Sequence, residues 1–381
     1  MRVFKILKKI LIVLLTVVIA AASVGALGVL TVSMALTSGN PENASGKKAV
    51  DVAIMDRYDM YMTNEVSNAL DGVLAIEKVY WLSDDDQVAP EPDQSKFGET
   101  DDPATMQWFL DAAAKLLNGQ ETIFKLDTKI AKGTKVMYYL DDTIMAITWK
   151  EVIGGAMYTL SEVKIAHPSQ FRRFLAGGSF ASPIQLTTTE MAASVNAVVA
   201  SSGDFYMFRR NGVIVYEGVV QRVDGNDVQT CYIDDNANMI FSHKGELPDI
   251  ESAQAFVDEN NIRFSVCFGP ILVENGEPFH IGWYPLGEPK GQFARAALCQ
   301  KGDLHYLLVT CNDEGPGPGL ANILEFQKAI LKFEPDMAYT LDGGQTAVIV
   351  MNDQMINRVT FGYQRNISDI IYFATAIPSQ N

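Results

Sequence analysis

The stretch Tyr339–Val350, YTLDGGQTAVIV, places an acidic residue and two glycines between two apolar runs. Runs rich in valine, isoleucine and tyrosine between turn residues are typical of strands, so we predict a strand on each side of Asp342. The two glycines fit either a tight hairpin turn or a backbone that approaches a ligand closely. The stretch therefore predicts strands and leaves two roles open for Asp342.

The same pattern continues from Tyr158 towards the C-terminus. Short apolar runs alternate there with turns rich in Gly, Asn and Asp. We predict strands within residues 158–166, 197–202, 204–210, 212–220, 231–235, 239–243, 265–276, 294–300, 304–310, 337–343 and 346–351. Helices are predicted at residues 188–197, 252–260 and 319–333. Together these elements predict the α+β fold class, with a strand-rich mixed α/β domain and a few packed helices.

The N-terminus predicts a membrane anchor. Residues 1–9, MRVFKILKK, carry four positive charges, and the 27 residues from Ile10 to Leu36 carry none. That run exceeds the roughly 20 residues that cross a bilayer core, so we predict one transmembrane helix. Its basic flank favours a cytoplasmic N-terminus and an extracellular C-terminal part at the plasma membrane. The alternative is a cleaved signal peptide, because residues 20–28, AAASVGALG, are small.

The region after this run divides into three parts. Residues 37–50 are small and polar and predict a linker. Residues 51–155 form a membrane-proximal region of unknown role, with a predicted helix at Thr105–Asn118, two strands or one bent strand within Lys135–Trp149, and an acidic loop at 83–103. Residues 156–381 form the main predicted domain.

Charge and cysteine usage limit the function classes. The formal charge is −16 in total and +4 in residues 1–9, which leaves −20 for residues 10–381 and disfavours nucleic acid as a partner. The cysteines, Cys231, Cys267, Cys299 and Cys311, lack CxxC spacing, so a zinc site is poorly supported. Their apolar surroundings predict buried free thiols, with a Cys299–Cys311 disulfide as the alternative. Motifs of serine hydrolases, zinc proteases and nucleotide-binding loops are absent from the sequence.

Several polar residues stand at predicted strand ends. Arg295 lies in the apolar run FARAAL, where its guanidinium suits a phosphate or carboxylate ligand, or alternatively a structural ion pair, for example with Asp342. Asp204 and Asp342 are candidates for the two carboxyl groups that glycoside cleavage commonly uses. Tyr206 suits either stacking on a sugar ring or packing in the core.

Six motifs in order resemble the phosphodiester glycosidase family. They are SSGDFY at 201–206, RNGVIVYEGVV at 210–220, FGPILVENGE at 268–277, ARAALCQKGDLHYLLVT at 294–310, GLANILEFQKA at 319–329, and YTLDGGQTAVIV with the tail QRNISDIIYF at 364–373. The resemblance covers residues 158–377. The family includes many bacterial exopolysaccharide-related proteins. It also includes the enzyme domain that uncovers mannose phosphate on lysosomal proteins.

The resemblance implies a hydrolase that cleaves a glycosidic bond to phosphate in cell-surface polysaccharide. It implies catalytic roles for Asp342, Arg295 and Asp204. It implies substrate binding by Gly343, Gly344, Thr346, Asn312 and Tyr206. No cofactor is expected, although a divalent cation such as calcium stays open, and the expected partners are a carbohydrate or sugar-phosphate substrate and the membrane.

The chain departs from the family's pattern at several positions. The family usually has Asn, Thr and Gly where this sequence has Ser202, Ala296 and Gln345, and its helix motif has Thr and Glu where this chain has Ala321 and Leu324. These substitutions favour the alternative function, a non-catalytic protein of envelope polysaccharide binding or assembly that retains the fold.

Overall fold

The computed structural model describes residues 88–225, 227–282, 284, 291–312 and 320–377. The transmembrane helix predicted at 10–36 and the linker predicted at 37–50 lie outside the described residues. None of the helices in the described part has the length and apolar character that crossing a membrane requires.

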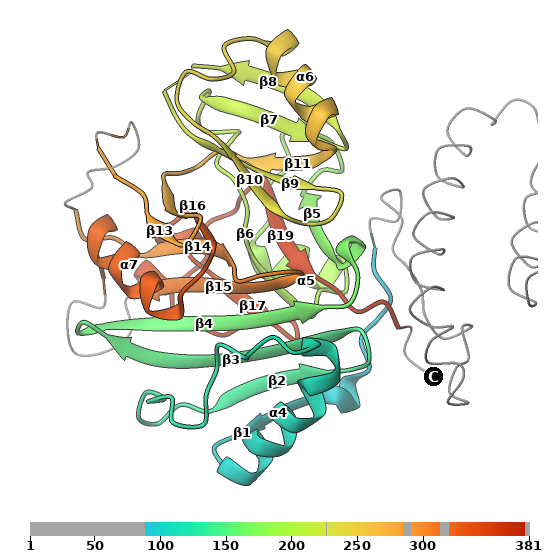
Figure 1. The fold of residues 1–381 in the computed structure, drawn as a ribbon, viewed down its shortest axis with the longest axis vertical. Coiled ribbons are helices and arrows are strands. Elements are labelled where there is room, and N and C mark those ends of the chain that lie inside the picture. The colour runs from blue at the N-terminus through green and yellow to red at the C-terminus, as the bar shows by residue number, and fades with distance from the viewer. Residues whose placement is uncertain (1–87, 226, 283, 285–290, 313–319, 378–381) are drawn as a thin grey trace, which may run out of the picture. The chain divides into compact units, whose positions relative to one another are not determined.

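The described residues contain four α-helices and nineteen strands (Figure 1). The helices are α4 Pro103–Leu117, α5 Thr188–Ser194, α6 Ile250–Asn260 and α7 Ile323–Ile330. The strands are β1 Phe97–Thr100, β2 Val136–Leu140, β3 Ile144–Ile153, β4 Ala156–Ile165, β5 Phe171–Leu175, β6 Val199–Ser202, β7 Gly212–Tyr216, β8 Val219–Asp224, β9 Thr230–Asp234, β10 Met239–Ser242, β11 Ile262–Val266, β12 Ile271–Glu274, β13 Glu277–Pro278, β14 Arg295–Gln300, β15 His305–Asn312, β16 Met337–Leu341, β17 Ile349–Met351, β18 Gln354–Met355 and β19 Asp369–Phe373. The 3-10 helices are η3 Gln94–Lys96, η4 Pro168–Gln170, η5 Leu331–Phe333, η6 Gly344–Thr346 and η7 Thr360–Gly362.

The strands form three antiparallel sheets. The largest has nine strands in the order β1-β2-β3-β4-β15-β14-β16-β12-β13. The second has the order β10-β9-β11-β7-β8, and the third has the order β18-β17-β6-β19-β5. Helix α4 packs on β3 and β4, α5 packs on β6, β17 and β19, and α6 packs on β8 and β11. The predicted strand-rich α+β domain is thus confirmed in the described part.

The nine-stranded sheet is the central layer because both of its faces are buried. On β15, Leu307 and Val309 face one core cluster with residues of α4 and α7, whereas Tyr306 and Leu308 face the cluster that joins the two smaller sheets. Successive side chains of a strand point to opposite faces, so a strand buried on both sides must be apolar almost throughout. This explains why the runs around β4, β14 and β15 lack the alternation of half-exposed strands.

Most predicted elements are confirmed, but three segments differ. The strand predicted at 265–276 is divided between β11 and β12, which belong to different sheets. Residues 204–210, predicted as a strand, form a turn in which the amides of Phe208 and Arg209 both donate to the carbonyl of Phe205. The Asp204 carboxylate accepts from the amide of Phe205 at 2.6 Å, which turns the chain at the strand's expected start. The predicted loop at 83–103 also contains β1, which pairs with β2.

The boundary predicted between residues 155 and 156 coincides with the turn between β3 and β4. These strands pair from Ile144 with Ile165 to Ile153 with Ala156. The described residues on both sides of this boundary also belong to one compact unit. Residues 88–155 therefore extend the central sheet that carries β14 and β16.

A buried carboxylate attaches the chain before β2 to this sheet. Glu162 of β4 accepts from the amides of Ile123 and Phe124, each at 2.8 Å, and lies 2.7 Å from Nε2 of His305 on β15. The side chains of Glu162 and His305 are fully buried. A buried carboxylate is stable only when such partners replace water, so this network fixes residues 120–125 against the sheet.

Replacing Glu162 with alanine is expected to lower the free energy of unfolding by about 3 kcal/mol, since two buried amides and His305 lose their acceptor. Urea denaturation followed by circular dichroism measures this change. Glu121→Ala is the matched control, because the Glu121 side chain is 85% exposed and pairs with Lys125 on the surface. That control is expected to change stability by less than about 0.5 kcal/mol. Equal effects of the two substitutions would contradict the role assigned to Glu162.

Candidate active site

Asp342 lies where the chain passes from one sheet to another. It directly follows β16 of the nine-stranded sheet, and the next strand, β17, belongs to the sheet of β6 and β19. The amide of Asp342 donates to Gly203 O at 3.4 Å, and Ser202 Oγ donates to Asp342 O at 2.9 Å. The hairpin alternative for this stretch is therefore wrong, because β16 and β17 do not pair.

The glycines after Asp342 allow the backbone to approach β14 closely. The amide of Gly344 donates to Ala294 O at 2.8 Å, and a Cβ on Gly343 would lie 2.7 Å from the same oxygen. Gly344 also has a φ of +66°, a conformation that favours glycine. These contacts hold Asp342 beside the start of β14, which is Arg295.

A cavity of about 230 Å³ opens at this place. Within the described residues its charged lining side chains are those of Arg295 and Asp342, and most of the others are apolar or aromatic. The lining residues are Phe205, Phe268, Gly269, Pro270, Ile281, Tyr284, Phe293, Ala294, Arg295, Ile323, Thr340, Leu341, Asp342, Gly343 and Gly344. An apolar cavity with a few convergent polar groups is the usual form of a small-molecule site.

The carboxyl group of Asp342 has a pKa above its ordinary value. Burial raises its pKa to about 6, and Arg365 and the nearby Thr346 hydroxyl oppose that rise. Nη2 of Arg365 donates to Oδ2 of Asp342 at 2.6 Å, and the side chains are 39% and 5% exposed, respectively. A carboxyl group with this pKa exchanges protons near neutral pH, which suits general acid or base catalysis.

Arg295 is held by backbone carbonyls. Its Nε donates to Ala321 O and its Nη2 donates to Gly291 O, both at 2.8 Å, and the guanidinium lies 5.5 Å from the centre of the Phe293 ring. Burial lowers its pKa to about 10, so it remains a cation at neutral pH. Within the described residues Asp342 pairs with Arg365 and not with Arg295, so the ion pair considered for Arg295 and Asp342 is not formed.

Asp204 lies outside the cavity in a buried charge cluster. Its Oδ2 accepts from the amide of Cys267 at 2.9 Å and lies 3.9 Å from Nη2 of Arg173. Arg173 donates from Nε to Asp369 Oδ2 at 2.7 Å, and all three charged side chains are almost fully buried. Burial raises the pKa of Asp369 to about 6, and Arg173 opposes that rise. Asp204 is thus placed to support the turn that carries Phe205 into the cavity wall.

Three further candidates also lie outside the cavity lining. Asn312 is buried and donates from Nδ2 to Ala347 O at 3.0 Å. Tyr206 is buried against the Phe180 ring, with its ring centre 4.7 Å from that of Phe180. Thr346 donates from Oγ1 to Gly343 O at 2.7 Å, which closes the turn after Asp342. Of the predicted substrate-binding residues, Gly343 and Gly344 line the cavity.

Arg365 was not singled out in the sequence. The Arg365 guanidinium lies 5.1 Å from the ring centre of Phe205 and 5.4 Å from that of Phe208. Phe205 and Phe208 stack at 4.8 Å, and Phe208 is half exposed. The family-like tail QRNISDIIYF contains Arg365, but neither its charge nor its spacing from Asp342 indicates that the two side chains meet.

The four cysteines are buried and free, as their surroundings predicted, and the disulfide alternative is wrong. Burial raises the pKa of each of these thiols. Among the residues that the structure describes, no group of three or more His, Cys, Asp or Glu side chains is arranged to hold a metal ion.

Several solved structures are similar to this chain, and three serve as examples. They are a hypothetical protein from Synechocystis (15% identity, 64% of each chain, TM-score 0.45), the zebrafish N-acetylglucosamine-1-phosphodiester alpha-N-acetylglucosaminidase catalytic domain auto-inhibited by its pro-peptide (15% identity, 61% of this chain and 84% of that chain, TM-score 0.48), and an exported protein from Burkholderia pseudomallei (13% identity, 58% and 74%, TM-score 0.38). The match thus spans less than two thirds of the Synechocystis protein. No curated protein sequence matches the chain.

A comparison with protein families is more informative. Residues 195–374 match the sequence profile of the phosphodiester glycosidases. The matched segment contains all six motifs on which the resemblance was based and the whole lining of the Asp342 cavity. The resemblance is therefore confirmed over residues 195–374, which are similar to the phosphodiester glycosidase domain.

Proposed function

We propose that the chain is a hydrolase that cleaves the glycosidic bond between a sugar and a phosphate. The observation that carries this proposal is the position of Asp342. Its carboxyl group, with a pKa of about 6, opens into a cavity beside Arg295 and is bonded to Arg365. The two cations can bind the negatively charged phosphate of a sugar phosphodiester. The titrating carboxyl group can accept a proton from the attacking water.

The two arginines supply the positive charge for the phosphate. Nη1 of Arg295 makes no hydrogen bond within the described residues, while Nε and Nη2 are bound to carbonyls that fix the guanidinium plane. Arg365 is partly exposed and shares the Asp342 carboxylate. Guanidinium groups hold phosphate oxygens through charge-assisted hydrogen bonds, and a fixed orientation reduces the entropy lost on binding.

Asp342 acts as the base in this proposal. A water molecule attacks the anomeric carbon and gives its proton to the Asp342 carboxylate, while the bond from that carbon to the phosphate oxygen breaks. The phosphate departs with the electron pair, so the products are the free sugar and a phosphomonoester. Phosphate is a good leaving group and needs little protonation, which fits a cavity whose described lining holds one carboxyl group.

The aromatic wall provides the sugar-binding surface. Phe205, Phe268, Phe293 and Tyr284 line the cavity, and aromatic faces pack on the apolar face of a sugar ring. The volume of about 230 Å³ lies below the range of roughly 300–1,000 Å³ typical of drug-sized ligands. A single sugar unit with its phosphate at the mouth is the substrate that such a cavity suits.

We propose that this activity takes place at the cell surface. The uncharged run at 10–36 would anchor the chain in the plasma membrane, with the catalytic domain outside the cell and polysaccharide of the cell surface as its substrate. The alternative function, binding of such polysaccharide without turnover, is favoured by the tight bond between Arg365 and Asp342. The two functions differ in one measurable property, the release of free sugar.

Replacing Asp342 with asparagine is expected to lower sugar release by about 10³-fold, since the general base is lost. The measurement incubates the full chain with UDP-N-acetylglucosamine and with an aryl N-acetylglucosaminyl phosphodiester, and follows free N-acetylglucosamine. Asp353→Asn, in the turn between β17 and β18, is the matched control and is expected to retain full activity. No release by folded protein that still binds polysaccharide would replace hydrolysis by the binding function, and release unchanged in Asp342→Asn would exclude Asp342 as the base.

The pH profile gives a second prediction. A base must be ionised, so kcat/KM is expected to fall tenfold per pH unit below about pH 6, the pKa of Asp342. Arg365→Gln removes a positive charge that lowers this pKa, so the acidic limb is expected to move up by about one pH unit. Arg210→Gln, with an exposed guanidinium, is the control and leaves the limb in place. A limb that stays near pH 6 in Arg365→Gln would show that another group titrates.

A further inference from the structure

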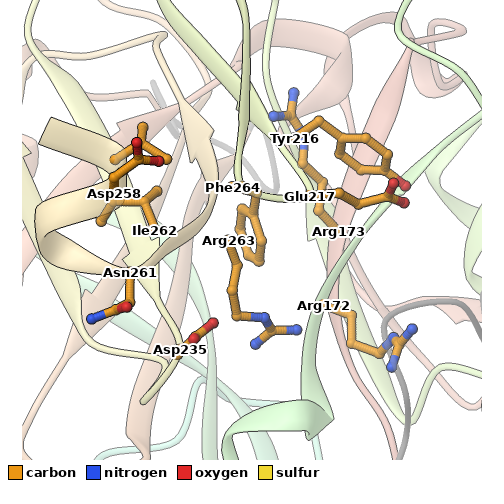
Figure 2. A pocket seen from close by; sticks show the side chains of 12 residues that line it. Arg172, Arg173, Tyr216, Glu217, Asp235, Asp258, Asn261, Ile262, Arg263 and Phe264 are labelled. Atoms are coloured by element: carbon orange, nitrogen blue, oxygen red, sulfur yellow. The ribbon is translucent and has the colours of Figure 1, made fainter. Parts of the chain in front are cut away.

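A second, larger cavity lies away from Asp342. It has a volume of about 480 Å³ and is lined by residues of β5, β7, α6 and β11 and of their connections (Figure 2). It shares no lining residue with the Asp342 cavity. The proposed function does not use it, so its chemistry is an independent question.

Three buried arginines line the inner part of this cavity. Arg172, Arg173 and Arg263 are each less than one tenth exposed. Nη1 of Arg263 donates to Pro168 O at 3.2 Å and to Phe171 O at 3.3 Å, and Arg173 is bonded to Asp369 and to the carbonyl of Ser265. Figure 2 shows Arg263 reaching into the space between β11 and β5, with Arg172, Arg173 and Glu217 on the far side. The guanidinium groups of Arg173 and Arg263 are therefore held in fixed positions.

The outer part of the cavity has the opposite charge. Glu217, Asp235, Asp258 and Asn261 are exposed and line the same cavity. Carboxylate and amide oxygens accept hydrogen bonds from hydroxyl groups. The rings of Tyr216 and Phe264 complete the lining. A bare inorganic anion would meet repulsion from these carboxylates on entry, whereas a ligand that surrounds its anionic group with hydroxyls would be bound by both parts.

We propose that this cavity binds an acidic saccharide, a sugar that carries a carboxylate or a phosphate. The anionic group lies against Arg172 and Arg263, where burial strengthens charge-assisted hydrogen bonds. The sugar hydroxyls donate to the carboxylates of Asp235 and Asp258 and to the Asn261 amide at the mouth. The volume of about 480 Å³ lies within the usual range of ligand sites. Whether the anionic group is a carboxylate or a phosphate is decided by the arms of the experiment.

The test measures binding to the full chain by isothermal titration calorimetry at low salt. The probes are glucuronate, glucose 6-phosphate, glucose and inorganic phosphate. At least one of the two acidic sugars is expected to bind about tenfold or more tightly than both glucose and inorganic phosphate, since only an acidic sugar meets both parts of the cavity. Arg263→Gln is expected to weaken that binding about tenfold or more, and Arg210→Gln, an exposed arginine outside the cavity, leaves it unchanged.

A second variant keeps the test decisive where Arg263→Gln does not fold. Glu217→Gln leaves the arginines in place and removes one negative charge from the mouth, so the acidic sugar is expected to bind about two- to fivefold more tightly, with glucose unaffected. Binding of inorganic phosphate as tight as that of glucose 6-phosphate would mean an adventitious ion only. That result would overturn the proposal. So would the absence of binding of either acidic sugar, and so would binding that neither Arg263→Gln nor Glu217→Gln changes.

Discussion

The contact between the backbone of Asp342 and the end of β6 is the constraint on which the candidate site depends. The amide of Asp342 donates to Gly203 O, and Ser202 Oγ donates to Asp342 O. These bonds join the end of β16 in the central sheet to the end of β6 in a smaller sheet. Strand ends expose backbone groups that the ladder no longer satisfies, so side chains there can face a ligand without disrupting a sheet.

The buried charge cluster stabilises the same junction from the interior. Arg173, Asp204 and Asp369 come from three separate segments, and Asp369 accepts from the amide of Asp204 at 3.0 Å. Removing these charges from water is costly, and the mutual bonds repay that cost only while all partners stay in place. The cluster therefore gives the 203–205 turn one conformation, in which Phe205 faces the Asp342 cavity. The absence of a side chain at Gly203 belongs to this arrangement, because a Cβ there would lie 2.4 Å from Oδ2 of Asp369.

The sequence predicts the elements of this fold better than their assembly. Local sequence patterns identify β14, β15 and β16 and all four helices. Strands buried on both faces are apolar runs, and helix ends carry capping residues. Helix α4, for example, begins at Pro103 after the capping residue Asp102 and ends at Leu117, before the capping residue Asn118 in a left-handed conformation. The pairing of β16 with β14 and the passage of the chain to another sheet at Asp342 depend on contacts distant in sequence, which no local pattern contains.

The same distinction applies to the candidate site. Asp342 and Arg295 belong to motifs whose residue types indicate chemistry, and the structure brings both to one cavity. Asp204 has the same residue type, but hydrogen bonds from the amides of Phe205 and Cys267 place it in the interior. Arg365 shows the converse, because its partner Asp342 is known only once the chain is folded. Residue type thus predicts which chemistry a site can hold, whereas burial and pairing decide which residues hold it.

The protonation of Asp342 follows from two opposing effects at this junction. Burial raises its pKa because the carboxylate loses contact with water, and Arg365 lowers it through a bond of 2.6 Å. Arg365 itself remains partly exposed, stacked beside Phe205 and Phe208. A change that moves these rings also changes the position of the cation that balances Asp342. The aromatic rings beside Arg365 and the charge of the Asp342 carboxyl group are therefore coupled.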